Sequence, residues 1–138
     1  RIDIRIRLVS IPCSPVEGRD FLCDPWAASE WFRDDLCQGP GQVFYVFPDG
    51  RVSVCCGYAN ENDALIVGSI RDDNVRGLMR KASERPFVRA VYEKGLERVR
   101  TCLTDKGVKF PGMTMDHCYF CWYILNKVPS DTLDVCLG

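Results

Sequence analysis

The sequence has little histidine, no long apolar run and no excess of charge of either sign. Only one histidine, His117, occurs among its 138 residues, so most acid–base and cysteine–histidine mechanisms lack a second candidate residue. No stretch approaches the roughly 20 apolar residues that a membrane-spanning helix requires. The formal net charge is only −1, which gives no overall attraction to nucleic acid or to an acidic membrane surface. We therefore expect neither nucleic acid nor a membrane as a partner.

Charge is uneven along the chain although the total is close to zero. Residues 1–70 carry six Lys or Arg against ten Asp or Glu, and residues 71–106 carry ten against six. A basic segment can bind nucleic acid. Here Glu84, Glu93 and Glu97 interrupt the basic residues at helical spacing, which is more typical of a solvated helix face.

Cysteine is the residue type that stands out. The chain has nine cysteines, an odd number, so a complete set of internal disulfides would leave one thiol over. The number also exceeds what packing alone would need in a reducing cytosol. The nine are Cys13, Cys23, Cys37, Cys55, Cys56, Cys102, Cys118, Cys121 and Cys136. The chemistry of this protein is therefore expected at its cysteines.

The first part of the chain is interpreted as a strand and a linker. Residues 2–8 alternate between apolar and polar side chains, which is the period of a half-buried strand. Proline and glycine predict a loop over residues 11–25, and a short helix is expected over residues 26–37. The strand has no evident partner, and the chain starts with arginine without a signal-peptide pattern. We expect residues 1–36 to be a remnant of a preceding domain and residues 37–138 to form the main domain.

A β-hairpin is the clearest local structure. Two β-rich runs, residues 43–47 and 51–56, flank Pro48-Asp49-Gly50, a sequence typical of a tight turn. A hairpin holds its two ends about one strand spacing apart, roughly 5 Å. Cys37 precedes the hairpin and Cys55 ends its second strand. We therefore expect these two thiols near the same open end.

Helices are expected after the hairpin. The first is capped by Asp72 or Asp73, the second runs without a break from Pro86 to Lys106, and the third is capped by Asp116. These elements predict a small α+β domain, with a hairpin, a helix pair and a helical turn that carries two cysteines.

Cys118-Tyr-Phe-Cys121 is a CxxC motif. On a helical turn this spacing points two sulfurs at one centre, as a metal ion or an iron–sulfur cluster requires. The same spacing occurs in redox dithiols. Together with Cys37 and Cys55, the motif makes four candidate thiols.

The order of these residues resembles the auxiliary-cluster region of radical SAM enzymes, the SPASM/Twitch domains. Cys37, Gly50-x4-Cys55 and Cys118-x2-Cys121 follow the order of that family. The runs FPDGRVSVCC, IVGSI and RPFVRAVYEKG are similar to its hairpin, its glycine-containing strand end and its helix pair. The resemblance covers about residues 37–127.

Two departures narrow this resemblance. SPASM domains with two clusters carry further cysteines where this chain has Lys127 and Asp131, so the shorter Twitch version with one cluster is the better match. The CxxxCxxC motif of the catalytic core is absent from the sequence. The chain therefore looks like the C-terminal accessory portion without the catalytic core, and we do not expect it to be an enzyme alone.

The resemblance implies a [4Fe–4S] cluster held by Cys37, Cys55, Cys118 and Cys121. In that family such clusters relay electrons, support the substrate site or stabilise the fold. Four thiolates leave no iron of the cluster free to bind a further ligand, which favours electron relay or a structural role over direct binding of substrate. The implied partners are a radical SAM catalytic domain or its substrate, and the expected location is the cytoplasm.

Other interpretations of the same four cysteines stay open. Zinc could occupy the same four-thiolate set, which would make the chain a structural or interaction module. The CxxC could serve a thiol oxidoreductase, although the surrounding βαβ pattern of that class is missing. The four cysteines could also form disulfides or pack as small apolar side chains.

Two residues beside the candidate ligands are alternatives to them. Neighbours on a strand point to opposite faces, and the GxxxxC spacing selects Cys55 over Cys56. His117 adjoins Cys118 and is an alternative ligand or proton carrier, with an exposed position at the helix start as the simpler interpretation.

Four cysteines lie outside the proposed set and its neighbours. Cys102 falls on an apolar helical stripe, which predicts packing in the core. Cys136 is a substitute ligand near the C-terminus. Cys13 and Cys23 lie in the proline-rich loop, where they either form a disulfide or serve a missing domain.

Overall fold

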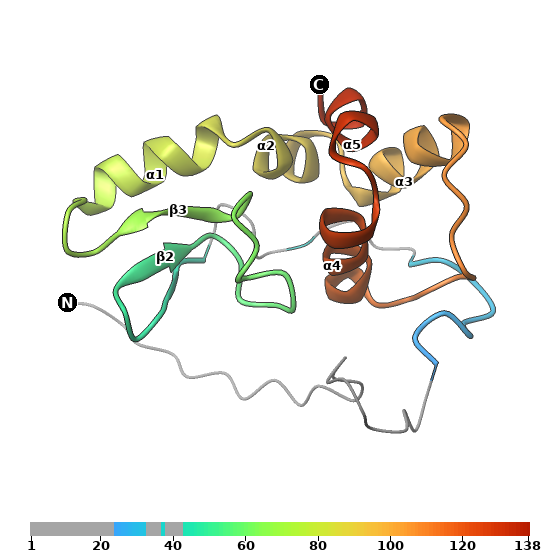
Figure 1. Cartoon of the computed structure of the whole chain (residues 1–138), viewed down its shortest axis with the longest axis horizontal. Coiled ribbons are helices and arrows are strands. Elements are labelled where there is room, and N and C mark those ends of the chain that lie inside the picture. Colours follow the sequence, from blue (N-terminus) through green and yellow to red (C-terminus); the bar gives the residue numbers. More distant parts are fainter. Residues whose placement is uncertain (1–23, 33–36, 38–42) are drawn as a thin grey trace.

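The computed structural model describes residues 24–32, 37 and 43–138. Within them the order of elements is β1 (Tyr45–Val46), β2 (Arg51–Ser53), β3 (Ile66–Ser69), α1 (Val75–Glu84), α2 (Pro86–Glu93), α3 (Leu96–Asp105), α4 (His117–Lys127) and α5 (Ser130–Leu137). The strands form an antiparallel sheet in the order β1-β2-β3, and α1 extends along β3 (Figure 1). The predicted α+β class is confirmed. The strand and the disulfide considered before residue 24 lie outside the described residues.

The hairpin forms where the sequence predicts it. Gly50 has a φ of 90°, a conformation that costs glycine little, and its N–H donates to the carbonyl of Phe47 at 2.9 Å. The Asp49 carboxylate accepts from the Arg51 N–H at 3.0 Å. The strands are shorter than expected, since regular pairing covers only Tyr45–Val46 and Arg51–Ser53. Cys55, in the segment that follows β2, is buried in the core of the domain.

The cap of the first helix lies one residue after Asp73 and two residues after Asp72, the two predicted caps. Asn74 is the N-cap, and its side chain accepts from the Gly77 N–H at 2.9 Å. Asp73 instead accepts from the Ser69 N–H at 3.2 Å and from Lys81 Nζ at 2.7 Å. The prediction of Asp72 or Asp73 as the cap was wrong because Asp73 links β3 to α1.

The single helix expected from Pro86 to Lys106 is two helices. Gly95 has a φ of 81° and is the N-cap of α3, and a positive φ cannot continue a right-handed helix. The break lets α2 and α3 each bury an apolar face. The helix α4 begins after the predicted cap, where Asp116 accepts from the Tyr119 N–H at 3.0 Å. A further helix, α5, follows it and was not predicted from the sequence.

The prediction of a helix over residues 26–37 is wrong for residues 26–32, which the structure describes. Residues 24–32 form turns and an isolated bridge between Ala27 and Met113. The carbonyl of Trp26 accepts from the Met113 N–H at 3.1 Å, and the Trp26 ring lies 4.7 Å from that of Tyr123 on α4. These long-range contacts override a weak helical pattern.

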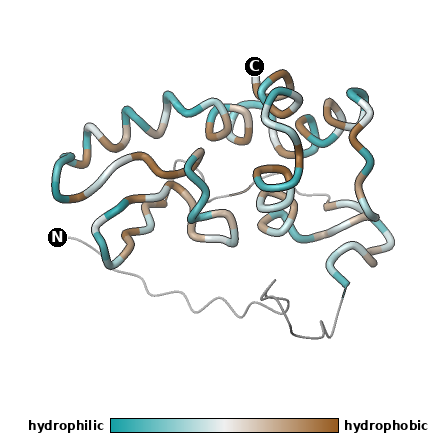
Figure 2. The backbone as a smooth tube through the Cα atoms, viewed as in Figure 1, coloured by the Kyte–Doolittle hydropathy of each residue, from teal (hydrophilic) through white to brown (hydrophobic). Residues whose placement is uncertain are grey.

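One hydrophobic core joins the sheet to the helices. Its largest fully buried side chains include Phe87, Phe120, Leu65, Leu96, Leu103 and Ile124. Figure 2 shows hydrophobic residues along β3, whereas α1 alternates between hydrophilic and hydrophobic residues. This pattern fits α1 as a surface helix that covers the sheet with one face. In the described part of the chain, no helix combines the length and the apolarity needed to cross a membrane.

A disulfide joins Cys102 on α3 to Cys136 on α5. This finding corrects two predictions, because Cys102 is not simply a packed thiol and Cys136 is not available as a substitute ligand. The helix that carries Cys136 was not predicted, so the pairing had no visible geometric basis in the sequence. Five other described cysteines remain thiols, namely Cys37, Cys55, Cys56, Cys118 and Cys121.

Candidate metal centre

Cys55 is placed by the turn that follows β2. Its N–H donates to the hydroxyl of buried Ser53 at 3.2 Å, and its sulfur accepts from the Gly57 N–H at 3.3 Å. The side chain is buried, whereas that of Cys56 is exposed. The two adjacent cysteines thus differ in environment, although both lie beyond the end of β2.

Cys118 and Cys121 are placed by the first turns of α4. The Asp116 cap fixes where this helix begins, and residues three apart lie on the same helix face. Cys121 is buried and Cys118 is half-buried. The fully buried Phe120 anchors the helix between them. The motif therefore presents two thiols from a helix held in place by the core.

Gly57 shows that the hairpin end and α4 meet at their sulfurs. A Cβ atom at position 57 would lie 2.8 Å from Cys118 Sγ and 3.7 Å from Cys55 Sγ. The two sulfurs can be no further apart than the sum of these distances. Two thiols that are distant in the sequence therefore converge over a glycine.

Burial raises the pKa of the converging thiols. The pKa of Cys55 rises to about 11 and that of Cys118 to about 12, and the pKa of the fully buried Cys121 rises well above its ordinary value. Desolvation is the largest cause for each, and a neighbouring Cys37 thiolate raises all three further. Cys37 thus lies within electrostatic range of the other three. These thiols are protonated at neutral pH unless a cation binds the thiolate form.

The donor chemistry of the site fits an iron–sulfur cluster. In the part of the chain that the structure describes, no three Cys, His, Asp or Glu side chains form a group that could hold a metal ion as they stand. A single zinc ion gathers thiolates at about 2.3 Å, whereas a cluster distributes its thiolates over several irons. The thiols around Gly57 supply the donor type of both centres, and the N–H that donates to Cys55 Sγ would stabilise a thiolate ligand in either.

His117 lies at the start of α4, but it is half-buried rather than exposed. Its ring centroid is 4.6 Å from that of Phe32, and its buried Nε2 atom has no hydrogen-bond partner. The prediction of an exposed residue was wrong because the segment that contains Phe32 packs on this end of the helix. The roles of ligand and proton carrier stay untested.

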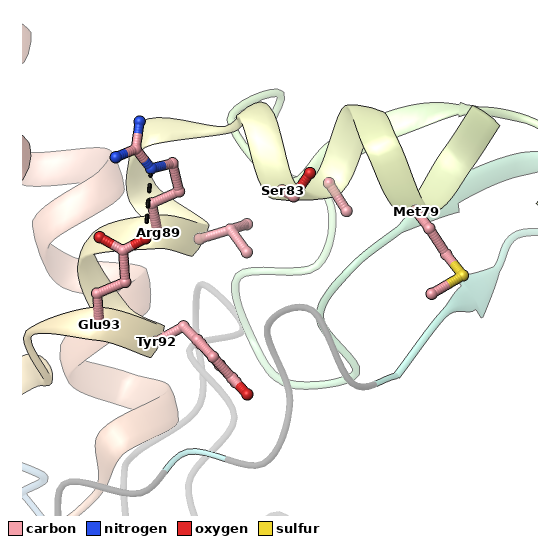
Figure 3. Close-up of a pocket in the computed structure, with 7 residues that line it drawn as sticks. Met79, Ser83, Arg89, Tyr92 and Glu93 are labelled. Atoms are coloured by element: carbon pink, nitrogen blue, oxygen red, sulfur yellow. Dashed lines mark ion pairs between the residues drawn. The ribbon is translucent and has the colours of Figure 1, made fainter. Parts of the chain in front are cut away.

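A separate groove of about 340 Å³ lies between α1 and α2. Met79 on α1 and Tyr92 on α2 line it, and Arg89 and Glu93, which also line it, form an ion pair of 3.5 Å (Figure 3). Its lining residues are Met79, Ala82, Ser83, Val88, Arg89, Tyr92 and Glu93. None is a cysteine, so the groove is not part of the candidate metal centre.

The fold and the site together define a small, cysteine-rich α+β domain with a candidate thiolate centre. The family model of SPASM, an iron–sulfur cluster-binding domain, matches residues 37–105, which is half of the chain. The chain therefore belongs to the SPASM family. The matched segment contains Cys37 and Cys55 and ends before the CxxC on α4. No curated protein and no solved structure matches the chain significantly.

Proposed function

We propose that this SPASM domain holds one [4Fe–4S] cluster through Cys37, Cys55, Cys118 and Cys121. The observation that carries the proposal is the convergence of Cys55 Sγ and Cys118 Sγ at Gly57. It joins the segment matched by the family to a CxxC outside it. Cys37 contributes to the raised pKa of each of the other three thiols, which supports it as the fourth ligand.

A cluster bound here would supply one-electron transfer. The protein contributes four thiolates, one N–H hydrogen bond to Cys55 Sγ, and a site next to buried Phe120 and Cys121. The reduction potential of such a centre depends on how well water is excluded and on the hydrogen bonds that the sulfurs accept. Because four thiolates complete the coordination of the irons, the role we propose is electron relay or structural support.

The partner we propose is a radical SAM catalytic domain, which would carry the CxxxCxxC motif that this chain lacks. The support for it is the family membership and the absence of that motif. The expected cytoplasmic location stays a prediction. The Cys102–Cys136 disulfide argues against it, because disulfides are rare in reducing compartments.

The test is anaerobic purification followed by absorbance spectroscopy and by iron, sulfide and zinc counts. A brown protein with about four irons and four sulfides per chain supports the proposal. Electron paramagnetic resonance of the reduced protein then distinguishes a [4Fe–4S] from a [2Fe–2S] cluster. A colourless protein with one zinc overturns the proposal in favour of a zinc module, and a protein that binds neither metal after reconstitution also overturns it.

A further inference from the structure

Gly57 occupies the space between the two segments of the candidate centre. Its N–H donates to Cys55 Sγ at 3.3 Å. A side chain at position 57 would enter the space next to Cys118 Sγ. We propose that Gly57 is a positioning residue for the cluster, which directs the sulfurs of Cys55 and Cys118 toward a common centre. This inference rests on the proposed function.

The steric part of the argument depends on how little Cys118 can move. A Cβ at position 57 would be 2.8 Å from Cys118 Sγ and 3.3 Å from Cys118 Cβ. The helix that carries Cys118 is fixed by its cap at Asp116 and by buried Phe120. The sulfur would therefore have to rotate to another rotamer, away from the position that faces Cys55.

The backbone at Gly57 does not itself require glycine. The described glycines with positive φ are Gly50, Gly68, Gly95 and Gly107, so alanine at position 57 needs no left-handed conformation. It also keeps the N–H that donates to Cys55. Any effect of Gly57→Ala on the centre therefore comes from the contact with Cys118 and not from backbone strain.

The experiment compares Gly57→Ala with Gly77→Ala under anaerobic reconstitution. Gly77 is a matched control because its added Cβ would make only ordinary contacts, the nearest at 3.5 Å to Asn74 Oδ1, and it lies in α1 away from the thiols. Iron and sulfide per chain, resistance of bound iron to a chelator, the reduction potential and the electron paramagnetic resonance signal are measured. We expect roughly tenfold weaker iron retention in Gly57→Ala, with a shifted potential and an altered signal, and no change in Gly77→Ala.

A second variant keeps the proposal falsifiable if Gly57→Ala also destabilises the metal-free chain. Removing the sulfur in Gly57→Ala/Cys118→Ala eliminates the 2.8 Å contact and leaves only the 3.3 Å approach to the Cβ at position 118, so the metal-free double variant should regain most of the thermal stability of Cys118→Ala. Failure to regain it would show that the added methyl group disturbs something other than Cys118, and would overturn the proposal.

The outcomes separate this inference from the proposed function. If the wild-type chain binds a cluster and Gly57→Ala matches it in iron retention, potential and signal, only the role of Gly57 is overturned. If the wild-type chain binds no iron, the proposed function fails and the role of Gly57 fails with it.

Discussion

Cys102 and Cys136 are joined by a disulfide that ties α3 to the C-terminal helix α5 across a separation of 34 residues. Cys136 is buried and Cys102 is half-buried. Lys94, the C-cap residue that follows α2, adds a hydrogen bond of 3.4 Å from its Nζ to the carbonyl of Leu137. Bonds from α2 and α3 therefore both hold α5 in place.

We expect the double variant Cys102→Ser/Cys136→Ser to unfold more easily than the wild type. In the chain-entropy model a loop of this size contributes about 4 kcal/mol, because the bond restricts the unfolded chain. Urea unfolding of the metal-free protein without reductant measures the difference. Wild-type protein with a reducing agent should fall toward the stability of the variant. Equal stability of wild type and variant without reductant would contradict the prediction.

Substitution of any one proposed ligand should remove the metal. We expect Cys37→Ala, Cys55→Ala, Cys118→Ala and Cys121→Ala each to lose most of the bound iron and the visible absorbance, because a buried cluster loses one of four thiolates. Cys56→Ala is the matched control, since Cys56 adjoins Cys55 but is exposed. Full iron in Cys37→Ala, or loss of iron in Cys56→Ala, would show that the proposed ligand set is incorrect.

Gly68→Ala should destabilise the sheet where β3 meets α1. Gly68 has a φ of 151°, and an added Cβ would lie 2.2 Å from Asp73 Oδ2. We expect a loss of about 1–3 kcal/mol in the free energy of unfolding, measured by urea titration. Gly107→Ala isolates the conformational part, because Gly107 has a φ of 87° and no atom within 4 Å of an added Cβ. Equal losses of unfolding free energy in the two variants would mean that the contact with Asp73 adds nothing to the destabilisation by Gly68→Ala.

Asp73 should make stability depend on pH in the acid range. The hydrogen bond from Lys81, followed by that from the Ser69 N–H, lowers the pKa of Asp73 below its ordinary value. A lowered folded-state pKa contributes stability above the unfolded-state pKa of about 4, and this contribution is lost as the pH falls through the folded-state pKa. We expect Asp73→Asn to be less stable than wild type at pH 6, with a smaller difference at pH 3. The urea unfolding midpoints of wild type and variant at the two pH values measure this difference in stability. A difference that is the same at both pH values would show that the Asp73 charge does not stabilise the fold.

Local sequence was enough to predict the elements that short-range chemistry controls. Pro48-Asp49-Gly50 predicts the hairpin because its φ preferences suit a tight turn. Asp116 predicts the start of α4 because a carboxylate at that position satisfies an N–H of the first turn. The spacing of the CxxC predicts that Cys118 and Cys121 share a helix face, since a helix repeats every 3.6 residues. The family resemblance was also visible in the order of the cysteines.

Tertiary structure decided the features that depend on contacts between distant segments. The Cys102–Cys136 bond requires α5 to lie against α3, and no local pattern specifies that packing. The positive φ of Gly95 interrupts an otherwise continuous apolar stripe, because that conformation cannot continue a right-handed helix. The meeting of Cys55 and Cys118 at Gly57 arises in the same way. Local sequence specified which residues carry thiols and which turn and helix present Cys55, Cys118 and Cys121. Packing decided which thiols meet, because burial of a shared core sets distances that sequence spacing cannot.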